Sequence, residues 1–317
     1  MTNVLLLSAG RRVELLEAFR RELSIANINS ALFAVDMRSE LSAACNRADF
    51  AISSPSATES DYCNFLVETI EANDIRLVIP TIDAELEVLA DLADDLAAVG
   101  AQAVISDKNF IQLCQDKRKT VAVFDQMGIE VPRIFDDKDI TFPCFSKPFN
   151  GSSSKNARLV QNKHEYTTLS IDPNLMFMEY MNSSFVEITV DAYFDKLGDL
   201  KCMVPRRRIE VRAGEVSKAI TQREFIYDFL IDKVRLLRGA RGCITLQLFF
   251  KASTEEVYGI EINPRFGGGF PLSYAAGANF PRWLIEEYLL GNQVPFVDEW
   301  EDNLLMLRYD ASVIVNG

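Results

Sequence analysis

The strongest constraint on the fold is a pair of apolar runs near the C-terminal end of the chain, at residues 243–250 and 257–263. Each run has the length of a β-strand and is rich in β-branched and aromatic residues. The polar segment between them, residues 251–256, is short enough to be a turn. The pattern predicts an antiparallel β-hairpin.

Polar residues alternate with apolar ones along the second strand of this hairpin. Glu261 and Asn263 share one face, whereas Ile260 and Ile262 share the other. Gln247 lies on the partner strand. A carboxylate and two amide oxygens on one face are hard ligands that suit Mg²⁺ and its phosphate partners. The alternative is that these residues form the solvent face of an ordinary hairpin.

The same face continues into a basic, glycine-rich turn. Arg265 follows Pro264, and three glycines occupy residues 267–269. A basic side chain beside glycine-freed backbone N–H groups is typical of an anion site. Together with the oxygen ligands, this turn favours a site for a metal–phosphate complex.

Gln247, the run at residues 261–265 and the following glycines resemble the metal-binding end of the ATP-grasp superfamily. The most similar branch is the one that resembles the carbamoyl phosphate synthetase large subunit, in which a Gln, a Glu and an Asn at this spacing hold two Mg²⁺ ions. The resemblance therefore implies that Gln247, Glu261 and Asn263 bind metal. It also implies ATP as the nucleotide and Mn²⁺ as a substitute for Mg²⁺.

Two lysines resemble the phosphate-binding lysines of this family. Lys117 belongs to an Asp-Lys pair within residues 107–127, which we expect to form one helix. Lys147 precedes a loop at residues 151–155 that includes Ser153 and resembles the lid over the ATP phosphates. Relatives often carry two or three glycines in this loop, whereas this chain has one.

Other residues resemble those that bind adenosine. An apolar strand ends at Glu179, Tyr180 and Met181, at the place of the family's adenine-binding hinge. Glu187 resembles the carboxylate that accepts hydrogen bonds from the ribose hydroxyls. The alternative for Glu187 is a cross-strand charge on a solvated face. Gln247 and Glu261 complete the expected ATP-binding set.

The resemblance also implies a chemistry. A substrate carboxylate attacks the γ-phosphate of ATP to give an acyl phosphate, and an amine then displaces phosphate. Lys147 would offset phosphate charge, while Arg265 and the backbone N–H of Gly268 would stabilise the acyl phosphate and the later oxyanion. The expected catalytic residues are therefore Lys147, Arg265 and Gly268.

The first third of the chain alternates short apolar runs with helical patterns, which predicts a parallel sheet covered on both sides. Ligands bind such sheets at the carboxyl ends of the strands. Arg11, Asp83 and Glu85 lie near those ends and are candidate substrate contacts; the alternative is that they cap helices or solvate turns. Arg207, in a run of three arginines, is a fourth candidate.

The expected fold class is α/β followed by α+β, in three parts. Residues 1–106 form a parallel-sheet pre-ATP-grasp domain, residues 107–182 the ATP-grasp lid region, and residues 183–317 the larger C-terminal domain that binds metal and ATP. ATP would lie between the last two parts.

Composition excludes several other functions. A net charge of −13 argues against a nucleic-acid or anionic membrane surface. The six cysteines form no Cys-x-x-Cys pair and are typical of reduced thiols in a cytoplasmic protein. The single histidine, His164, argues against zinc and against a Ser-His-Asp mechanism. We expect small-molecule partners, a carboxylate and an amine, and the family allows a homodimer.

The leading hypothesis is a carboxylate–amine ligase. A carbamoyl phosphate synthetase-like subunit that phosphorylates bicarbonate or carbamate is an alternative; with one ATP-grasp unit it would need a dimer or a partner subunit. A non-catalytic, ATP-binding regulatory protein is a second alternative, opposed by the intact metal triad. A dehydrogenase is opposed by the turn after the first strand, which has only Gly10 where a dinucleotide fingerprint has three glycines.

Overall fold

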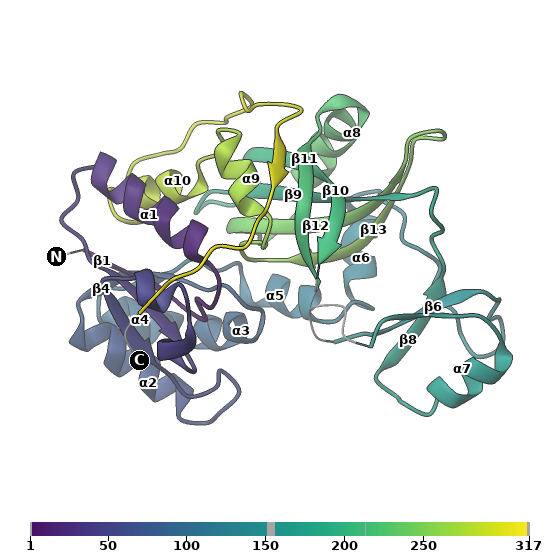
Figure 1. The fold of residues 1–317 in the computed structure, drawn as a ribbon, viewed down its shortest axis with the longest axis horizontal. Helices are drawn as coiled ribbons and strands as arrows, with labels where there is room; N and C mark the ends of the chain where they lie inside the picture. Colours follow the sequence, from purple (N-terminus) through teal and green to yellow (C-terminus); the bar gives the residue numbers. More distant parts are fainter. Residues whose placement is uncertain (1, 151–155, 213, 316–317) are drawn as a thin grey trace.

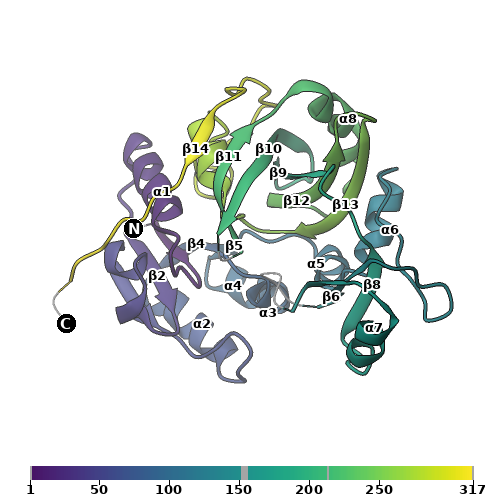
Figure 2. The same cartoon turned by 45° about the vertical axis from the view of Figure 1, so that its right-hand side comes forward.

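The computed structural model of the protein describes residues 2–150, 156–212 and 214–315. These residues form three β-sheets, each built from a continuous part of the chain. The N-terminal sheet and the small second sheet lie at opposite ends below the large C-terminal sheet (Figure 1). Figure 2 shows that the C-terminal sheet is strongly curved.

The N-terminal sheet is parallel throughout, as predicted. Its strand order is β3-β2-β1-β4-β5. The strands are β1 (Asn3–Leu6), β2 (Leu32–Asp36), β3 (Phe50–Ser53), β4 (Ile75–Ile79) and β5 (Gln102–Ala103). The helices are α1 (Val13–Ile25), α2 (Tyr62–Ala72), α3 (Ala84–Asp91) and α4 (Ala93–Ala98). Alternate residues of β1 enter two separate cores, Val4 with α1 and Leu5 with α2, so both faces of the sheet are covered.

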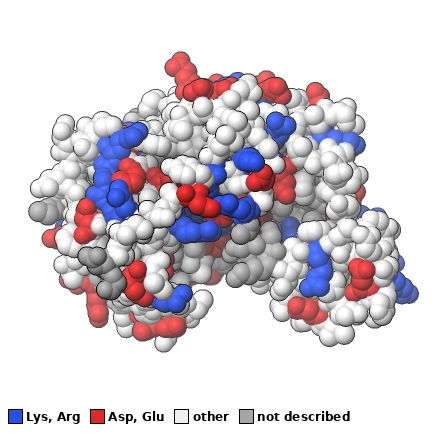
Figure 3. Space-filling model, viewed as in Figure 1, with Lys and Arg blue, Asp and Glu red and all other residues white. Residues whose placement is uncertain are grey.

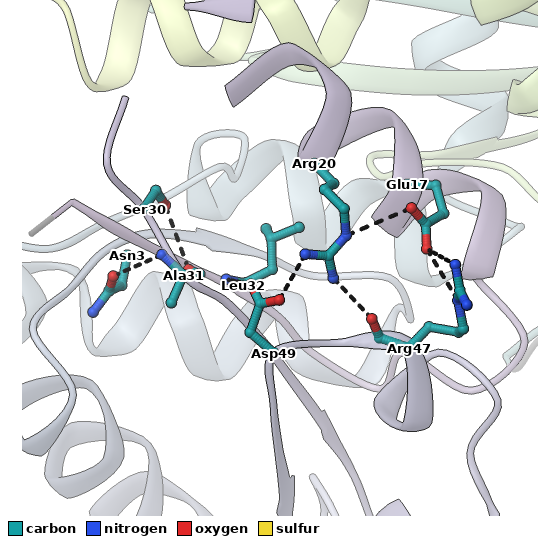
Figure 4. A network of polar contacts seen from close by, with 8 residues as sticks. All are labelled: Asn3, Glu17, Arg20, Ser30, Ala31, Leu32, Arg47 and Asp49. Carbon is teal, nitrogen blue, oxygen red and sulfur yellow. Dashed lines mark hydrogen bonds and ion pairs between the residues drawn. The ribbon is translucent and has the colours of Figure 1, made fainter. Parts of the chain in front are cut away.

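A polar network fixes α1 against the start of β2 (Figure 4). Arg20 on α1 donates to the carboxylate of Asp49 at 2.6 Å and to the carbonyl of Arg47 at 2.8 Å. The second carboxylate oxygen of Asp49 accepts the N–H of Leu32 at 2.8 Å. Arg47 also pairs with Glu17 on α1, at 3.0 Å. The network holds in place the helix that begins directly after the turn that follows β1.

The small second sheet lies within the predicted lid region and is called the lid below. Its order is β7-β6-β8 and its pairs are antiparallel. The lid contains β6 (Cys144–Pro148), β7 (Arg158–Val160), α7 (Lys163–Leu169) and β8 (Leu175–Glu179). Its own small core contains Cys144, Val160 and Phe177. The loop at residues 151–155, with the candidate phosphate contact Ser153, lies outside the described residues.

The prediction of a single helix at residues 107–127 is wrong. The structure has two helices here, α5 (Lys108–Gln115) and α6 (Thr120–Gln126), with a non-helical link between them. The carboxylate of Asp116 accepts the backbone N–H of Arg118 at 2.9 Å, a local bond that competes with the helix. The N–H of Lys117 donates instead to the carbonyl of Phe149, just after β6, at 2.9 Å. The break therefore joins Lys117 to the lid.

Helices α5 and α6 do not pack in the lid, although the sequence assigned them to the lid region. Phe110 of α5 and Phe124 of α6 enter the large core shared with the C-terminal sheet. The three domain ranges stay predictions, but within residues 107–182 the two helices and the three-stranded sheet belong to different cores.

The C-terminal sheet has the order β13-β12-β9-β10-β11-β14. Its strands are β9 (Val186–Phe194), β10 (Leu200–Arg212), β11 (Glu215–Thr221), β12 (Gly242–Lys251), β13 (Glu256–Asn263) and β14 (Leu305–Leu307). The helices of this part are α8 (Glu224–Val234), α9 (Phe270–Ala275) and α10 (Phe280–Tyr288). The predicted hairpin is confirmed: β12 and β13 are antiparallel, with Gln247 opposite Glu261.

The cysteines and the single histidine are further candidate reactive side chains. All six cysteines are free thiols, and five of them are buried. His164 is exposed on α7. No helix in the described ranges combines the length and apolarity needed to cross a membrane.

Close contact between α6 and β13 depends on a glycine. The register of the hairpin shifts between Gln247 and Leu248, which leaves Ile260 without a cross-strand partner. Beside this bulge, the N–H of Gly259 donates to the carbonyl of Glu130 at 2.7 Å. A Cβ atom on Gly259 would lie 2.5 Å from the ring of Phe124. Only glycine lets the ring pack this close to the strand that carries Glu261.

We expect Gly259→Ala to lower the free energy of unfolding by about 1–3 kcal/mol, because the added methyl group overpacks the contact with Phe124. Denaturant unfolding measures this change. In a Phe124→Leu background the same substitution should cost less. An equal cost in both backgrounds would show that the ring contact is not the cause.

Candidate active site

One face of the C-terminal sheet is lined with polar side chains from four neighbouring strands. Directly opposed residues point to the same side of a sheet, so Glu261, Gln247, Thr189 and Arg206 form one row. Alternation along each strand adds the neighbouring rows on this face. Those rows contain Asn263, Thr245 and Asp191 on one side, and Glu187 and Arg208 on the other.

The three expected metal ligands lie together on this face. Asn263 donates its side-chain N–H to the Oε1 atom of Glu261 at 3.0 Å, and its own Oδ1 atom accepts from Arg265 at 3.2 Å. The Oε1 atom of Gln247 accepts from Arg208 at 3.4 Å. Among the described residues no cluster of three His, Cys, Asp or Glu side chains could hold a metal. A set of one carboxylate and two amide oxygens suits a metal that also binds phosphate oxygens.

Both expected phosphate-binding lysines approach the metal ligands. The Nζ atom of Lys117 lies 4.0 Å from the Oε2 atom of Glu261. The Nζ atom of Lys147 donates to the carbonyl of the bulged Ile260 at 3.5 Å. Burial lowers the pKa of Lys147 to about 8; the carboxylate of Glu261 opposes this shift and the charge of Lys117 adds to it. Two partly buried cations beside one carboxylate form a site for a polyanion.

A small cavity beside these lysines lies between the lid and the C-terminal domain. Its lining is mainly apolar, with Met176 and Met178 from β8, Ile260 from β13 and Phe124 from α6. The cavity has a volume of about 10 Å³ in this structure, which is room for about one water molecule and not for a nucleotide ring. Sequence reasoning missed Met176, Met178 and Ile260, although the alternation along β8 shows that the two methionines share a face.

The expected hinge residues follow directly on the cavity-lining part of β8. Glu179 ends the strand, and its N–H donates to the carbonyl of Arg133 at 2.8 Å. Tyr180 is exposed and Met181 is partly buried. None of the three lines the cavity among the described residues. Their role toward adenine stays a prediction.

Arg208, and not Arg207, belongs to the site face of β10. Arg208 donates to Glu187 at 2.5 Å, so the expected ribose carboxylate has a partner in this structure. The preceding candidate, Arg207, is exposed and points to the opposite face, because side chains alternate along a strand. Arg206 shares the face of Arg208 but is 1% exposed and forms a bidentate pair with Asp191, at 2.8 and 3.1 Å.

The glycine turn rests on this buried ion pair. A Cβ atom on Gly269 would lie 2.3 Å from the Nη1 atom of Arg206, so only glycine permits the contact. Asp191 also accepts the hydroxyl of Ser273 on α9 at 2.6 Å. The carbonyl of Gly268 accepts from Arg308 at 2.6 Å. Two arginines therefore hold the turn from different sides.

Arg265 connects the metal-binding strand with the N-terminal domain. Its guanidinium forms two hydrogen bonds with the carboxylate of Asp83, at 2.9 and 2.7 Å. Asp83 was a candidate substrate contact, but both of its oxygens bind Arg265. The pair orients the guanidinium of Arg265, a geometry that planar guanidinium and carboxylate groups favour, and the role of Asp83 toward substrate stays a prediction.

Glu85 and Arg11, two further candidate substrate contacts, have partners within the protein, and their contact with substrate stays a prediction. Glu85 is fully buried and accepts hydrogen bonds from Ser8 at 2.6 Å, Tyr62 at 3.1 Å and the N–H of Thr81 at 3.3 Å. Burial raises its pKa to about 7. Glu85 therefore joins the turns after β1 and β4. Arg11 is largely exposed and pairs with Glu215 at 3.1 Å.

Two further arginines near the glycine turn were missed by sequence reasoning. Arg12 follows Arg11 in the turn after β1, and Arg308 follows β14. The Arg11-Arg12 doublet was a usable signal, because it lies at the carboxyl end of a parallel strand. No sequence signal pointed to Arg308.

Two family models match the chain. The model described as "PylC-like, N-terminal domain" matches residues 4–105. The model described as "ATP-grasp in the biosynthetic pathway with Ter operon" matches residues 172–309. A comparison with curated protein sequences found no match.

Solved structures share the fold at low sequence identity. The biotin carboxylase domain of Hydrogenobacter thermophilus 2-oxoglutarate carboxylase has a TM-score of 0.76 and 17% identity, over 96% of this chain and 73% of that one. N5-carboxyaminoimidazole synthetase from Staphylococcus aureus has a TM-score of 0.68 and 16% identity, over 93% and 78%. L-amino acid ligase from Bacillus licheniformis has a TM-score of 0.66 and 16% identity, over 91% and 74%.

The family models and the shared fold agree with the order of the sheets and with the composition of the site face. They confirm the expected fold class, a parallel-sheet domain followed by an ATP-grasp fold. Residues 172–309 therefore match an ATP-grasp family, and residues 4–105 match a PylC-like N-terminal domain.

Proposed function

We propose that this protein is an ATP- and Mg²⁺-dependent ligase that activates a small-molecule carboxylate as an acyl phosphate for attack by an amine. One observation carries the proposal: Gln247, Glu261 and Asn263 lie on one sheet face, with Lys117 4.0 Å from Glu261 and Lys147 beside Ile260. This arrangement combines metal ligands with two cations for a triphosphate.

The proposed reaction has two steps. A carboxylate oxygen of the acid attacks the γ-phosphorus of ATP, and the bond from that phosphorus to the bridging oxygen breaks, which releases ADP. The amine nitrogen then attacks the acyl carbon, phosphate leaves, and the nitrogen loses a proton to water or a carboxylate. Bound Mg²⁺ would neutralise phosphate charge in the first step.

The residues of the chain have separate tasks in this scheme. Gln247, Glu261 and Asn263 hold the metal, and Lys117 and Lys147 offset charge on the phosphates. Arg265, oriented by Asp83 and next to the glycine turn, binds the reacting carboxylate and its acyl phosphate. Arg208 is a further candidate contact to the nucleotide, because it lies beside Glu187 and Gln247.

The structural relatives support a nucleotide-dependent ligase. The biotin carboxylase domain from Hydrogenobacter thermophilus is a dimer in complex with MgADP, ADP and bicarbonate, and the synthetase from Staphylococcus aureus is complexed with ADP. The protein from Bacillus licheniformis is an L-amino acid ligase. We further propose two Mg²⁺ ions, with Mn²⁺ as a substitute, and a homodimer. The cytoplasmic location stays a prediction from the cysteine pattern.

Bicarbonate is a second candidate for the phosphorylated acid. The bicarbonate in the structure of the biotin carboxylase domain favours it. This would be the carbamoyl phosphate synthetase-like reaction, and that assignment stays a prediction. The non-catalytic regulatory role is also untested, and the complete metal triad argues against it.

The proposal is tested by measuring ADP release from Mg-ATP with a panel of acids and amines, in which bicarbonate with ammonia is one combination. We expect release to require one organic acid together with an amine, because the acyl phosphate needs both. Release with bicarbonate and ammonia as the only active combination would favour the second candidate. ATP binding without release under any combination would contradict a ligase.

Glu261→Gln should reduce this ADP release by about a hundredfold or more, because it removes the charge of the only carboxylate among the three metal ligands. Glu256→Gln, at the partly buried start of the same strand, is the matched control and should leave release unchanged. Equal activity of the two variants would exclude the proposed metal site.

We expect kcat/KM for ATP to fall as the pH rises above about 8, since the pKa of Lys147 in the free protein is lowered to about 8 and its charge is lost there. Measuring kcat/KM for ATP from about pH 6 to about pH 10 tests this expectation. In Lys147→Arg the guanidinium stays charged, so the fall should vanish. If kcat/KM for ATP still falls above about pH 8 in that variant, a side chain other than Lys147 causes the fall.

Glu187→Ala should raise KM for ATP by about tenfold with little change in kcat, because it removes the acceptor proposed for the ribose hydroxyls. Steady-state kinetics with varied ATP and saturating acid measures it. If only the KM for the acid changes, Glu187 does not contact the nucleotide.

A further inference from the structure

Four arginines from different parts of the chain gather around the glycine turn. Arg11 and Arg12 come from the turn after β1, Arg265 from the end of β13, and Arg308 from the segment after β14. Figure 3 shows basic and acidic side chains gathered near the middle of this face of the molecule, where β14 and the segment after it pass. The protein has a net charge of −13, so a basic cluster of this kind stands out.

Three of these four arginines have carboxylate partners. Arg265 binds Asp83, while Arg11 and Arg308 share Glu215 at 3.1 and 3.2 Å. Arg308 also lies 3.5 Å from Glu14. Arg12 differs from them. Within the described residues its guanidinium has no hydrogen bond and no ion pair, although it lies beside the glycine turn, where a Cβ atom on Gly268 would be 3.4 Å from its Nη1 atom.

The position of Arg12 is electrostatically unfavourable without a ligand. Burial, helped by the charges of Arg265 and Arg308 and opposed by the carboxylate of Glu215, lowers the pKa of Arg12 to about 10. A partly buried cation between two other cations costs stability unless an anion joins them. Three guanidiniums around one backbone turn are arranged to surround an anionic group.

The turn that carries Arg12 is held on all sides. The N–H of Gly10 donates to Asp36 at 2.9 Å, and the carbonyl of Gly10 accepts the N–H of Ala44 and the hydroxyl of Ser42, both at 3.0 Å. The N–H of Arg12 donates to the carbonyl of Ala9 at 2.7 Å. A site whose backbone is already ordered loses less entropy when a ligand binds.

We infer that the acid substrate carries a second anionic group, a carboxylate or a phosphate, which Arg12 and Arg308 bind beside Gly268 while Arg265 faces the carboxylate to be activated. This inference rests on the proposed ligase function. It narrows the substrate class from any small acid to acids with two anionic groups. An acid with a single anionic group would need only Arg265, which is already bound to Asp83.

The test is isothermal titration calorimetry without nucleotide, with butyrate, succinate and 3-phosphonopropionate as probes. We expect the two dianions to bind about tenfold tighter than butyrate, as one charge-assisted contact implies. Arg12→Gln should remove that advantage and leave butyrate unaffected. Tighter binding of succinate would indicate a carboxylate as the second group, and tighter binding of 3-phosphonopropionate would indicate a phosphate.

Arg235→Gln is the matched control, since it removes one positive charge from an exposed pair with Asp232 on α8. It should leave all three affinities unchanged. The melting temperature of Arg12→Gln gives a second measurement. It should equal or exceed that of the unaltered protein, because the substitution relieves repulsion from Arg265 and Arg308. A clear decrease would indicate a structural role and overturn the inference.

Failure of the inference and failure of the ligase proposal have different signatures. Equal binding of butyrate and the dianions, no dianion binding, or an Arg12→Gln variant with unaltered affinities would overturn the second anionic group, whatever the turnover. Dianion binding that depends on Arg12, with no ADP release for any acid and amine, would instead contradict the ligase and leave the anion site in place.

Discussion

The bidentate ion pair between Arg265 and Asp83 determines how the two halves of the site meet. Arg265 follows directly on the strand that carries Glu261 and Asn263, and Asp83 lies just before α3 in the N-terminal domain. The pair is partly buried, so solvent and salt screen it less than a surface pair. It brings the turn after β1, with Arg12, against the glycine turn. A shared apolar core, in which Phe19 of α1 contacts Phe266, supports the same arrangement.

The sequence pattern alone was sufficient to predict which residues share a face of a strand, because side chains alternate with a period of two. Alternation predicted that Glu261 and Asn263 share a face, and the short polar segment predicted the hairpin that adds Gln247. Alternation also implied that Arg207 faces away from its two neighbours. It could not say which face meets the site, because that depends on the register of β10 against β9.

The features that the sequence did not show depend on contacts between residues far apart in the chain. The helix break before Lys117 involves the carbonyl of Phe149, which is far along the chain. Asp83 and Glu85 were correctly located at strand ends, but their partners are an arginine in another domain and three hydrogen-bond donors that bury the second carboxylate. Sequence shows that a carboxylate is near a crevice, but only tertiary structure shows which groups already occupy it.

The hydrogen bond from Lys117 to Phe149 makes the electrostatics of the site depend on the position of the lid. The guanidinium of Arg118 also stacks on the ring of Phe149, 3.5 Å from its centre, so two neighbouring residues hold the end of β6. Any rotation of the lid sheet would pull on the same backbone that carries the Lys117 ammonium group. The segment between α5 and α6 thus ties the backbone of Lys117, whose ammonium group lies 4.0 Å from Glu261, to the end of β6.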